Sequence, residues 1–258
     1  MSKVTLVLLN TLTLTAVIIL NALAGTGEIG DNSVGDVSQK YDTMFTPAGY
    51  AFSIWGFIYL LLAGFVIFQW VALSRKDDHD IINQTGAIFI VSNLANAGWL
   101  FLWLNEYIGL SVLAILFLLF SLIALVSRLK LEIWDAPVRI LIFVWWPFAI
   151  YFGWIIVATV ANIAAFLTTL NWDGSPLSPQ TWTIILILAA TAIYLLLIFT
   201  RNLRESALVG IWAFVAIGVR HGSTNLEITV TAGIGALILL AAILYHGYLN
   251  RSANPWRN

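Results

Sequence analysis

The charged positions divide the sequence into long apolar segments. A helix needs roughly 20 apolar residues to cross the ~30 Å hydrocarbon core of a bilayer. Runs near that length between charges or turn residues predict eight transmembrane helices, at residues 4–24, 50–73, 81–104, 108–127, 137–169, 182–200, 206–219 and 228–249. The fifth run is long for one crossing, so this helix is expected to tilt or to project from the membrane. The seventh run is short for a full crossing.

The basic residues of the connections alternate between the two sides of this arrangement. One side holds Lys3, Arg75, Lys76, Arg128, Lys130, Arg139, Arg201, Arg204, Arg251 and Arg257, whereas the other holds only Lys40 and Arg220. Because cytoplasmic loops carry an excess of Lys and Arg, this split predicts that both termini are cytoplasmic. We expect the protein in the bacterial inner (plasma) membrane.

Composition supports the same class of protein. Of the 258 residues, 60% are hydrophobic and 10% are charged, and the mean hydropathy is +0.92. Soluble domains carry roughly 25% charged residues, so the chain is predicted to be an all-α integral membrane protein. The net charge of −1 offers no basic surface for nucleic acid, and the absence of cysteine excludes disulfides and thiolate metal sites.

The predicted helices carry no charged residue near their centres, where proton and ion pathways usually have one. All four lysines lie outside the helices, which excludes a retinal Schiff base. The internal polar residues are amides and hydroxyls, among them Asn93, Asn96, Thr159 and Asn162. Such groups either join helices by hydrogen bonds or line a cavity, and the sequence leaves both interpretations open.

The chain contains 12 tryptophans. Several lie near the ends of the predicted helices, where interfacial aromatic belts explain them. Others lie within or close to the helices: Trp55, Trp99, Trp103, Trp145, Trp146, Trp154 and Trp212. An indole ring with its N–H donor suits a packed core and also suits a large planar ligand.

Three segments together resemble the TspO family of translocator and tryptophan-rich sensory proteins. The first is Phe45-Thr46-Pro47-Ala48-Gly49-Tyr50 followed by Phe52, Trp55 and Tyr59, the second is Ser92, Asn96 and Trp99, and the third is Tyr151, Trp154, Ala158, Thr159 and Asn162. The third segment matches the family pattern without gaps. Ala48 replaces a proline of the family turn, Phe45 and Tyr50 replace its tryptophans, and Ser92 replaces an amide.

The resemblance implies a TspO-like five-helix transmembrane domain over residues 1–170. Residues 171–258 would then form a C-terminal extension of about three more transmembrane helices. In such a protein, the loop at residues 25–44 is expected to fold over the outer mouth of the bundle and close a pocket. Pro47 fixes φ and Gly49 permits a tight bend, so the chain can turn sharply before the second long helix.

The resemblance also implies a ligand-binding site, formed by Phe45, Pro47, Tyr50, Phe52, Trp55, Tyr59, Asn96, Trp99, Tyr151, Trp154, Thr159 and Asn162. The expected function is a membrane receptor or carrier for a hydrophobic planar ligand in transport or stress sensing. A porphyrin or haem-type tetrapyrrole is the first candidate ligand, followed by a sterol or other lipid. No cofactor or metal is expected to be obligatory.

Two other functions stay open. The chain could be an accessory structural subunit of a larger membrane complex, or an enzyme that degrades porphyrin in light, as some family members are reported to do. We expect no enzyme, because the sequence shows no acid/base pair, nucleophile or metal cluster. Besides the lipid bilayer and a hydrophobic small molecule, a homodimer partner is considered. Thr231 and Gly235, like Ala232 and Ala236, have the small-xxx-small spacing that permits close helix packing within or between chains.

Overall fold

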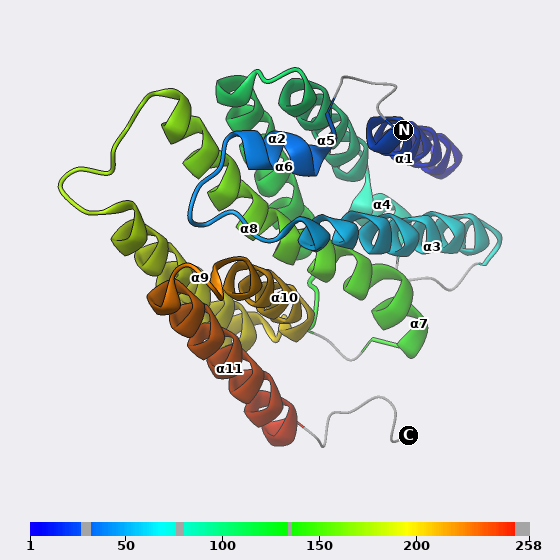
Figure 1. The fold of residues 1–258 in the computed structure, drawn as a ribbon. Coiled ribbons are helices and arrows are strands. Elements are labelled where there is room, and N and C mark those ends of the chain that lie inside the picture. Colours follow the sequence, from blue (N-terminus) through cyan, green and yellow to red (C-terminus); the bar gives the residue numbers. More distant parts are fainter. Residues whose placement is uncertain (27–31, 76–79, 134–135, 251–258) are drawn as a thin grey trace.

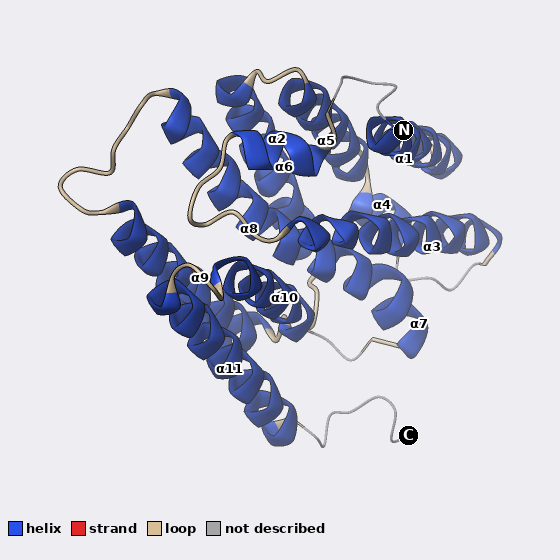
Figure 2. Cartoon of the chain, in the orientation of Figure 1, coloured by secondary structure: helices blue, strands red, loops and turns tan. Residues whose placement is uncertain are grey.

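The computed structural model describes residues 1–26, 32–75, 80–133 and 136–250. Within these residues the regular structure is helical, as Figure 2 shows, which confirms the predicted all-α class. The elements are α1 (Lys3–Thr26), α2 (Val34–Lys40), the 3₁₀-helix η1 (Gly49–Ser53), α3 (Ile54–Ser74), α4 (Ile81–Thr85), α5 (Ile88–Leu104), α6 (Ile108–Arg128), α7 (Val138–Ile140), the π-helix η2 (Leu141–Trp145), α8 (Trp146–Thr169), α9 (Pro179–Arg201), α10 (Arg204–His221) and α11 (Leu226–Leu249).

Every predicted transmembrane segment is helical over most of its length, although the segment at residues 81–104 is divided between α4 and α5. Six helical stretches are long and apolar enough to cross a membrane, namely Lys3–Ala24, Gly49–Ser74, Ile108–Arg128, Val138–Thr169, Pro179–Arg201 and Leu226–Leu249. The other two predicted segments are covered by α5, with 17 residues, and α10, with 18. At 1.5 Å per residue these span only about 26–27 Å, so full crossings by α5 and α10 stay a prediction.

The segment predicted as one helix over residues 81–104 is interrupted, so that prediction was wrong. Helix α4 ends at Thr85, and α5 begins at Ile88. Between them, Gly86 has a φ of 52°, which lies in the left-handed region. A Cβ at Gly86 would lie 3.1 Å from the carbonyl oxygen of Asn83. The backbone therefore turns at the one residue type that tolerates this conformation.

The long fifth segment is one continuous helical run with an irregular start. The run Val138–Thr169 contains 32 residues. Its π-helix η2 ends at Trp145, two residues before Pro147, which is the second residue of α8. Proline has no N–H to bond the carbonyl one turn earlier. A widened π turn before the proline accommodates the missing bond, so the helix continues without a break.

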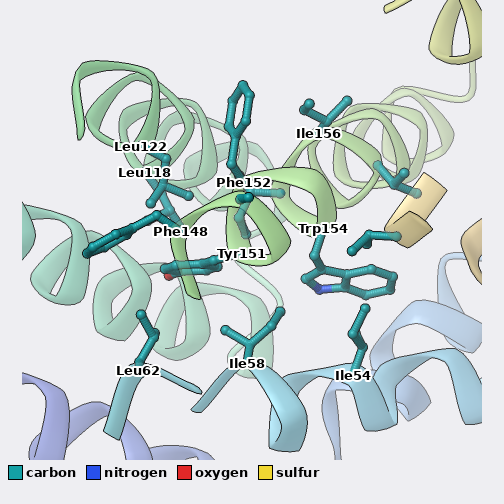
Figure 3. Packing of buried hydrophobic residues seen from close by; sticks show 14 of the residues in the cluster. Ile54, Ile58, Leu62, Leu118, Leu122, Phe148, Tyr151, Phe152, Trp154 and Ile156 are labelled. Atoms are coloured by element: carbon teal, nitrogen blue, oxygen red, sulfur yellow. The ribbon is translucent and has the colours of Figure 1, made fainter. Parts of the chain in front are cut away.

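The helices form a bundle with α8 near its middle, and α9, α10 and α11 pack along one side of it (Figure 1). Figure 3 shows the core where α3, α6 and α8 meet, with Leu62, Leu118 and Tyr151 among the buried side chains. Apolar contact alone does not hold the first helix in place. Asn10 donates to Gln69 at 3.1 Å, Trp70 to Thr11 at 3.0 Å, and Asn93 to Thr13 at 3.1 Å.

The C-terminal helices contact α8 through a close approach of two backbones. Ser206 of α10 donates to the Ala149 carbonyl at 2.6 Å, and Tyr194 of α9 donates to the Gly153 carbonyl at 2.8 Å. A Cβ at Gly153 would lie 2.7 Å from the carbonyl oxygen of Ser206, so only glycine fits there. The predicted boundary at residue 170 thus separates two parts that pack tightly on each other.

The small residues of α11 lie inside the chain. Ala232 is fully buried, and a Cβ at Gly235 would meet Thr191 of α9 at 3.0 Å and Phe214 of α10 at 3.2 Å. Of the two interpretations of the small-xxx-small spacing, the structure therefore supports packing within the chain. The homodimer stays a prediction, and this motif does not support it.

Candidate functional site

The predicted loop before the second long helix contains a short helix, α2, that the sequence analysis did not expect. Ser33 caps it: the Asp36 amide donates to Ser33 Oγ at 3.2 Å, and the Ser33 amide donates to Asp36 Oδ2 at 2.9 Å. This reciprocal capping fixes where the helix begins, and hydrogen bonds from Ser33 lower the pKa of Asp36. Trp103 of α5 donates to the Val34 carbonyl at 3.1 Å, which holds α2 against the bundle.

We call residues 34–53 the cover. It comprises α2, the turn around Pro47, and η1, and it crosses one end of the bundle (Figure 1). The expected fold-over of the loop is present for its described residues, while residues 27–31 lie outside them. Gly49 is not among the glycines with positive φ, which are Gly86 and Gly174. The bend therefore comes from the turn before Gly49 and from the 3₁₀ turns after it, and not from a left-handed glycine.

Beneath the cover, aromatic rings from α3 and α5 form a row. Trp55 stacks on Tyr59 with ring centroids 5.6 Å apart, and on Trp99 at 5.7 Å. Trp99 in turn stacks on Trp103 at 6.0 Å, with the planes inclined by 20°. Trp154 of α8 meets Trp55 edge-on at 6.4 Å and closes the row from the side.

Hydrogen bonds hold two of these indoles, that of Trp103, through the Val34 carbonyl, and that of Trp99. Trp99 Nε1 donates to Asn162 Oδ1 at 2.9 Å, and Asn162 Nδ2 donates to Ser111 Oγ at 2.9 Å. Asn162 thereby links α5, α6 and α8. Trp154 differs, because its Nε1 is buried without a hydrogen-bond partner in the described structure. A buried indole N–H usually has a partner, so this one is available to an acceptor atom.

A small cavity lies between the cover and the ring row. Its lining consists of Val34, Ser38, Pro47, Phe52, Trp55, Trp99, Trp103, Trp154, Val157, Ala158, Ala161 and Asn162. The free volume is about 30 Å³, enough for about one or two water molecules. Ligand pockets usually measure roughly 300–1,000 Å³, so the cavity is too small for such a ligand in this conformation.

The predicted site residues fall into three groups. Pro47, Phe52, Trp55, Trp99, Trp154 and Asn162 line the cavity. Tyr59, Tyr151 and Asn96 lie behind it: Tyr151 meets Trp55 edge-on at 6.0 Å, and Asn96 donates to the Tyr59 hydroxyl at 3.2 Å. The structure does not bring Phe45, Tyr50 and Thr159 to the cavity: Phe45 is buried elsewhere, Tyr50 is 42% exposed, and the Thr159 hydroxyl donates to the Ile155 carbonyl of its own helix.

Several lining residues were missed. Trp103 follows Trp99 by four residues, and that spacing places both on one helix face, so it could have been found. Val34 and Ser38 lie on α2, for which the Ser33 to Asp36 spacing was the available sign. Ala158 belongs to the family pattern of the third segment but was not predicted as a site residue, whereas Val157 and Ala161 carry no chemical signature and only the packing of α8 reveals them.

The residues that line the cavity are uncharged, and a charged pair joins the end of α2 to the connection after α5. Lys40, at the end of α2, contacts both Glu106 oxygens at 2.6 and 2.7 Å, and Tyr41 donates to the same carboxylate at 2.8 Å. The hydrogen bond from Lys40 lowers the pKa of Glu106, and the same contact raises the pKa of Lys40. This group joins the cover to the connection between α5 and α6.

A helical bundle of membrane-spanning length that encloses an aromatic cavity under a loop-borne helix defines a polytopic membrane protein with a candidate ligand site. Comparison with family models identifies its relatives. The model of the TSPO-like proteins matches residues 7–245, and the chain belongs to this family. The match runs through the predicted boundary at residue 170 and includes most of the C-terminal helices. No curated protein and no solved structure matches the chain significantly.

Proposed function

We propose that the protein is a membrane receptor or carrier for a hydrophobic planar ligand, with a porphyrin-type tetrapyrrole as the first candidate and a sterol or other lipid as the second. The observation that carries this proposal is the row of stacked rings from Tyr59 to Trp103 beside a cavity under the cover. Planar ligands gain favourable stacking against such rings. The biological role proposed with it is transport or stress sensing.

The cavity lining suggests which part of a ligand it would hold. None of the lining residues is charged. Burying an ion without a partner is costly, so the inserted part of the ligand should be uncharged. Trp154 Nε1 would donate to one acceptor atom on it. Carboxylates of a tetrapyrrole would then stay outside the cavity, and Lys40, two residues after the lining residue Ser38, is the basic side chain of the cover.

Haem is a weaker candidate than a metal-free ring. The lining residues include no histidine, cysteine, methionine or tyrosine that would bind its iron. We therefore propose recognition through ring stacking and the Trp154 N–H, without an iron ligand. A non-catalytic role fits the same set of residues, because Ser38 and the Trp154 N–H are not an acid/base pair.

A typical ligand pocket is at least about ten times larger than this cavity, so the cavity must widen before a ligand can bind. The tryptophan rings are held from below by α3, α5 and α8, whereas the cover lies over them as a short helix and a turn. Movement of the cover is therefore the proposed route of access.

The test is titration of the purified protein with protoporphyrin IX, followed by tryptophan fluorescence. Saturable quenching is expected. Trp154→Phe removes the N–H and should weaken binding about fivefold, the scale of one hydrogen bond. Trp154→Ala should weaken it by roughly 1–3 kcal/mol, as expected for loss of a large buried side chain. Trp172→Ala is the control, because Trp172 is 42% exposed in the connection between α8 and α9.

Other outcomes separate the alternatives. Equal affinities for wild type, Trp154→Ala and Trp172→Ala would place the ligand elsewhere. Absence of saturable binding to the folded protein would favour the accessory-subunit function. Loss of porphyrin absorption on illumination, with a new product by mass, would favour the porphyrin-degrading enzyme.

A further inference from the structure

The cover continues from α2 across to α10, a helix of the C-terminal part. Arg220 Nη2 lies 2.7 Å from Asp42 Oδ1, and His221 Nε2 lies 2.8 Å from the carbonyl oxygen of Met44. His221 is only 9% exposed, and a carbonyl can only accept, so the ring N–H donates here. Two successive residues at the end of α10 thus hold the first part of the turn.

Two further contacts follow along the same helix. The Ala48 amide donates to the Ala216 carbonyl at 3.1 Å, and Trp212 Nε1 donates to the Ala51 carbonyl at 3.1 Å. The Trp212 ring also meets the Tyr50 ring edge-on, with centroids 5.2 Å apart. Trp212, Ala216 and Arg220 are spaced by four residues, which places them on one face of α10.

This face of α10 therefore follows the cover from Asp42 to Ala51. Pro47 and Phe52, which line the cavity, lie within or directly beside that stretch. The cover cannot rise from the ring row while these contacts persist, because backbone groups on both sides of Pro47 are bonded to α10.

A second attachment lies at the other end of the cover, where Lys40 pairs with Glu106. The side chain of Lys40 is 57% exposed, and exposed ion pairs contribute little to stability. The contacts of His221 and Trp212 are less exposed to solvent, and each satisfies a backbone carbonyl of the cover. The stronger restraint is thus on the α10 side.

We propose that α10 is a clamp that holds the cover closed, and that the C-terminal helices control access to the cavity in this way. The ligand proposal assigns no role to α9, α10 and α11, and the clamp does not depend on which ligand binds. The same helix is held against α8 by the contact of Ser206 with Ala149 and Gly153.

The chain contains no cysteine, so a single Ser38→Cys substitution gives a unique probe in the cavity wall. Ser38 is 7% exposed, and its rate of reaction with a maleimide in purified, ligand-free protein reports how often the cover opens. His221→Leu and Trp212→Phe each remove one hydrogen bond to the cover. Each should raise the labelling rate about fivefold, and together they should raise it further.

Three controls make the result specific. Val219→Ala changes an exposed residue of α10 and should leave Ser38→Cys labelling unchanged. Glu106→Gln tests the other attachment and should have the smaller effect. A separate Ser121→Cys probe, buried in α6 away from the cover, reports general loosening of the bundle.

Equal Ser38→Cys labelling in the His221→Leu, Trp212→Phe and Val219→Ala backgrounds would overturn the clamp. A parallel rise at Ser121→Cys would overturn it as well, because the effect would then be global. A larger effect of Glu106→Gln than of the two α10 variants would assign the restraint to the α5–α6 side. No ligand is used, so failure of the clamp is distinct from failure of the binding proposal.

Discussion

Replacing Gly153 with alanine tests how closely α8 and α10 approach. The added Cβ would lie 2.7 Å from the Ser206 carbonyl oxygen and 2.8 Å from its Cα, which are backbone atoms that cannot rotate away. The two helices must therefore separate. Overpacking of this kind costs about 1–3 kcal/mol.

The separation also weakens two hydrogen bonds that cross the contact. These are Ser206 Oγ to the Ala149 carbonyl and Tyr194 to the Gly153 carbonyl. Interhelical hydrogen bonds in membranes are worth about 0.6–2 kcal/mol each. Alanine is favoured over glycine in a helix by about 1 kcal/mol, which offsets part of the loss. We expect a net destabilisation of about 2–3 kcal/mol.

The assay is equilibrium unfolding in mixed micelles of increasing SDS fraction, followed by circular dichroism. Gly98→Ala is the matched control, because nothing lies within 4 Å of a Cβ at that position on α5. It should be neutral or stabilising by up to about 1 kcal/mol. Ser206→Ala removes one hydrogen bond without adding a clash, so it should cost less than Gly153→Ala. Identical unfolding curves for Gly153→Ala and Gly98→Ala would refute the close approach.

Two further predictions concern charge. Desolvation, followed by the nearby charge of Glu205, raises the pKa of Glu132 to about 8, against its ordinary 4.5. Because the folded state holds this proton more tightly, its stability falls as pH rises from about 4.5 to 8, and Glu132→Gln should remove that loss while keeping an acceptor for Asn202. Thermal unfolding of both proteins from pH 5 to 9 checks this, and parallel pH profiles would contradict it. For topology, Ser175→Cys should react with an impermeant maleimide in intact cells and Ser2→Cys should not, as the basic residues predict; the reverse pattern would invert the orientation.

The partners of the buried amides are one feature that the sequence did not predict. Asn93 and Asn96 are three residues apart and share a helix face, yet Asn93 bonds Thr13 of α1 whereas Asn96 bonds Tyr59 of α3. The sequence left open whether they join helices or line a cavity. Neither lies in the cavity lining. Both join helices, and only the placement of α1 and α3 decides this.

The sequence by itself determined the membrane class, the positions of the long helices apart from the break at Gly86, and the likeness to the TSPO-like family. These properties depend on local composition, since an apolar run of sufficient length forms a helix in a bilayer regardless of its neighbours. It also identified Trp55, Trp99 and Trp154 as candidate site residues, because they recur at fixed spacings in the family pattern.

Only the tertiary structure decided which faces of the helices meet. In a soluble protein the apolar stripe of a helix marks its buried face, but lipid is as apolar as a protein core, so the same pattern does not separate inside from outside. For this reason no pattern in the sequence indicated that Val157 and Ala161 line the cavity, or that Trp212 and His221 of α10 hold the cover. Contacts between residues more than 150 positions apart, such as His221 with Met44, are fixed by the fold as a whole.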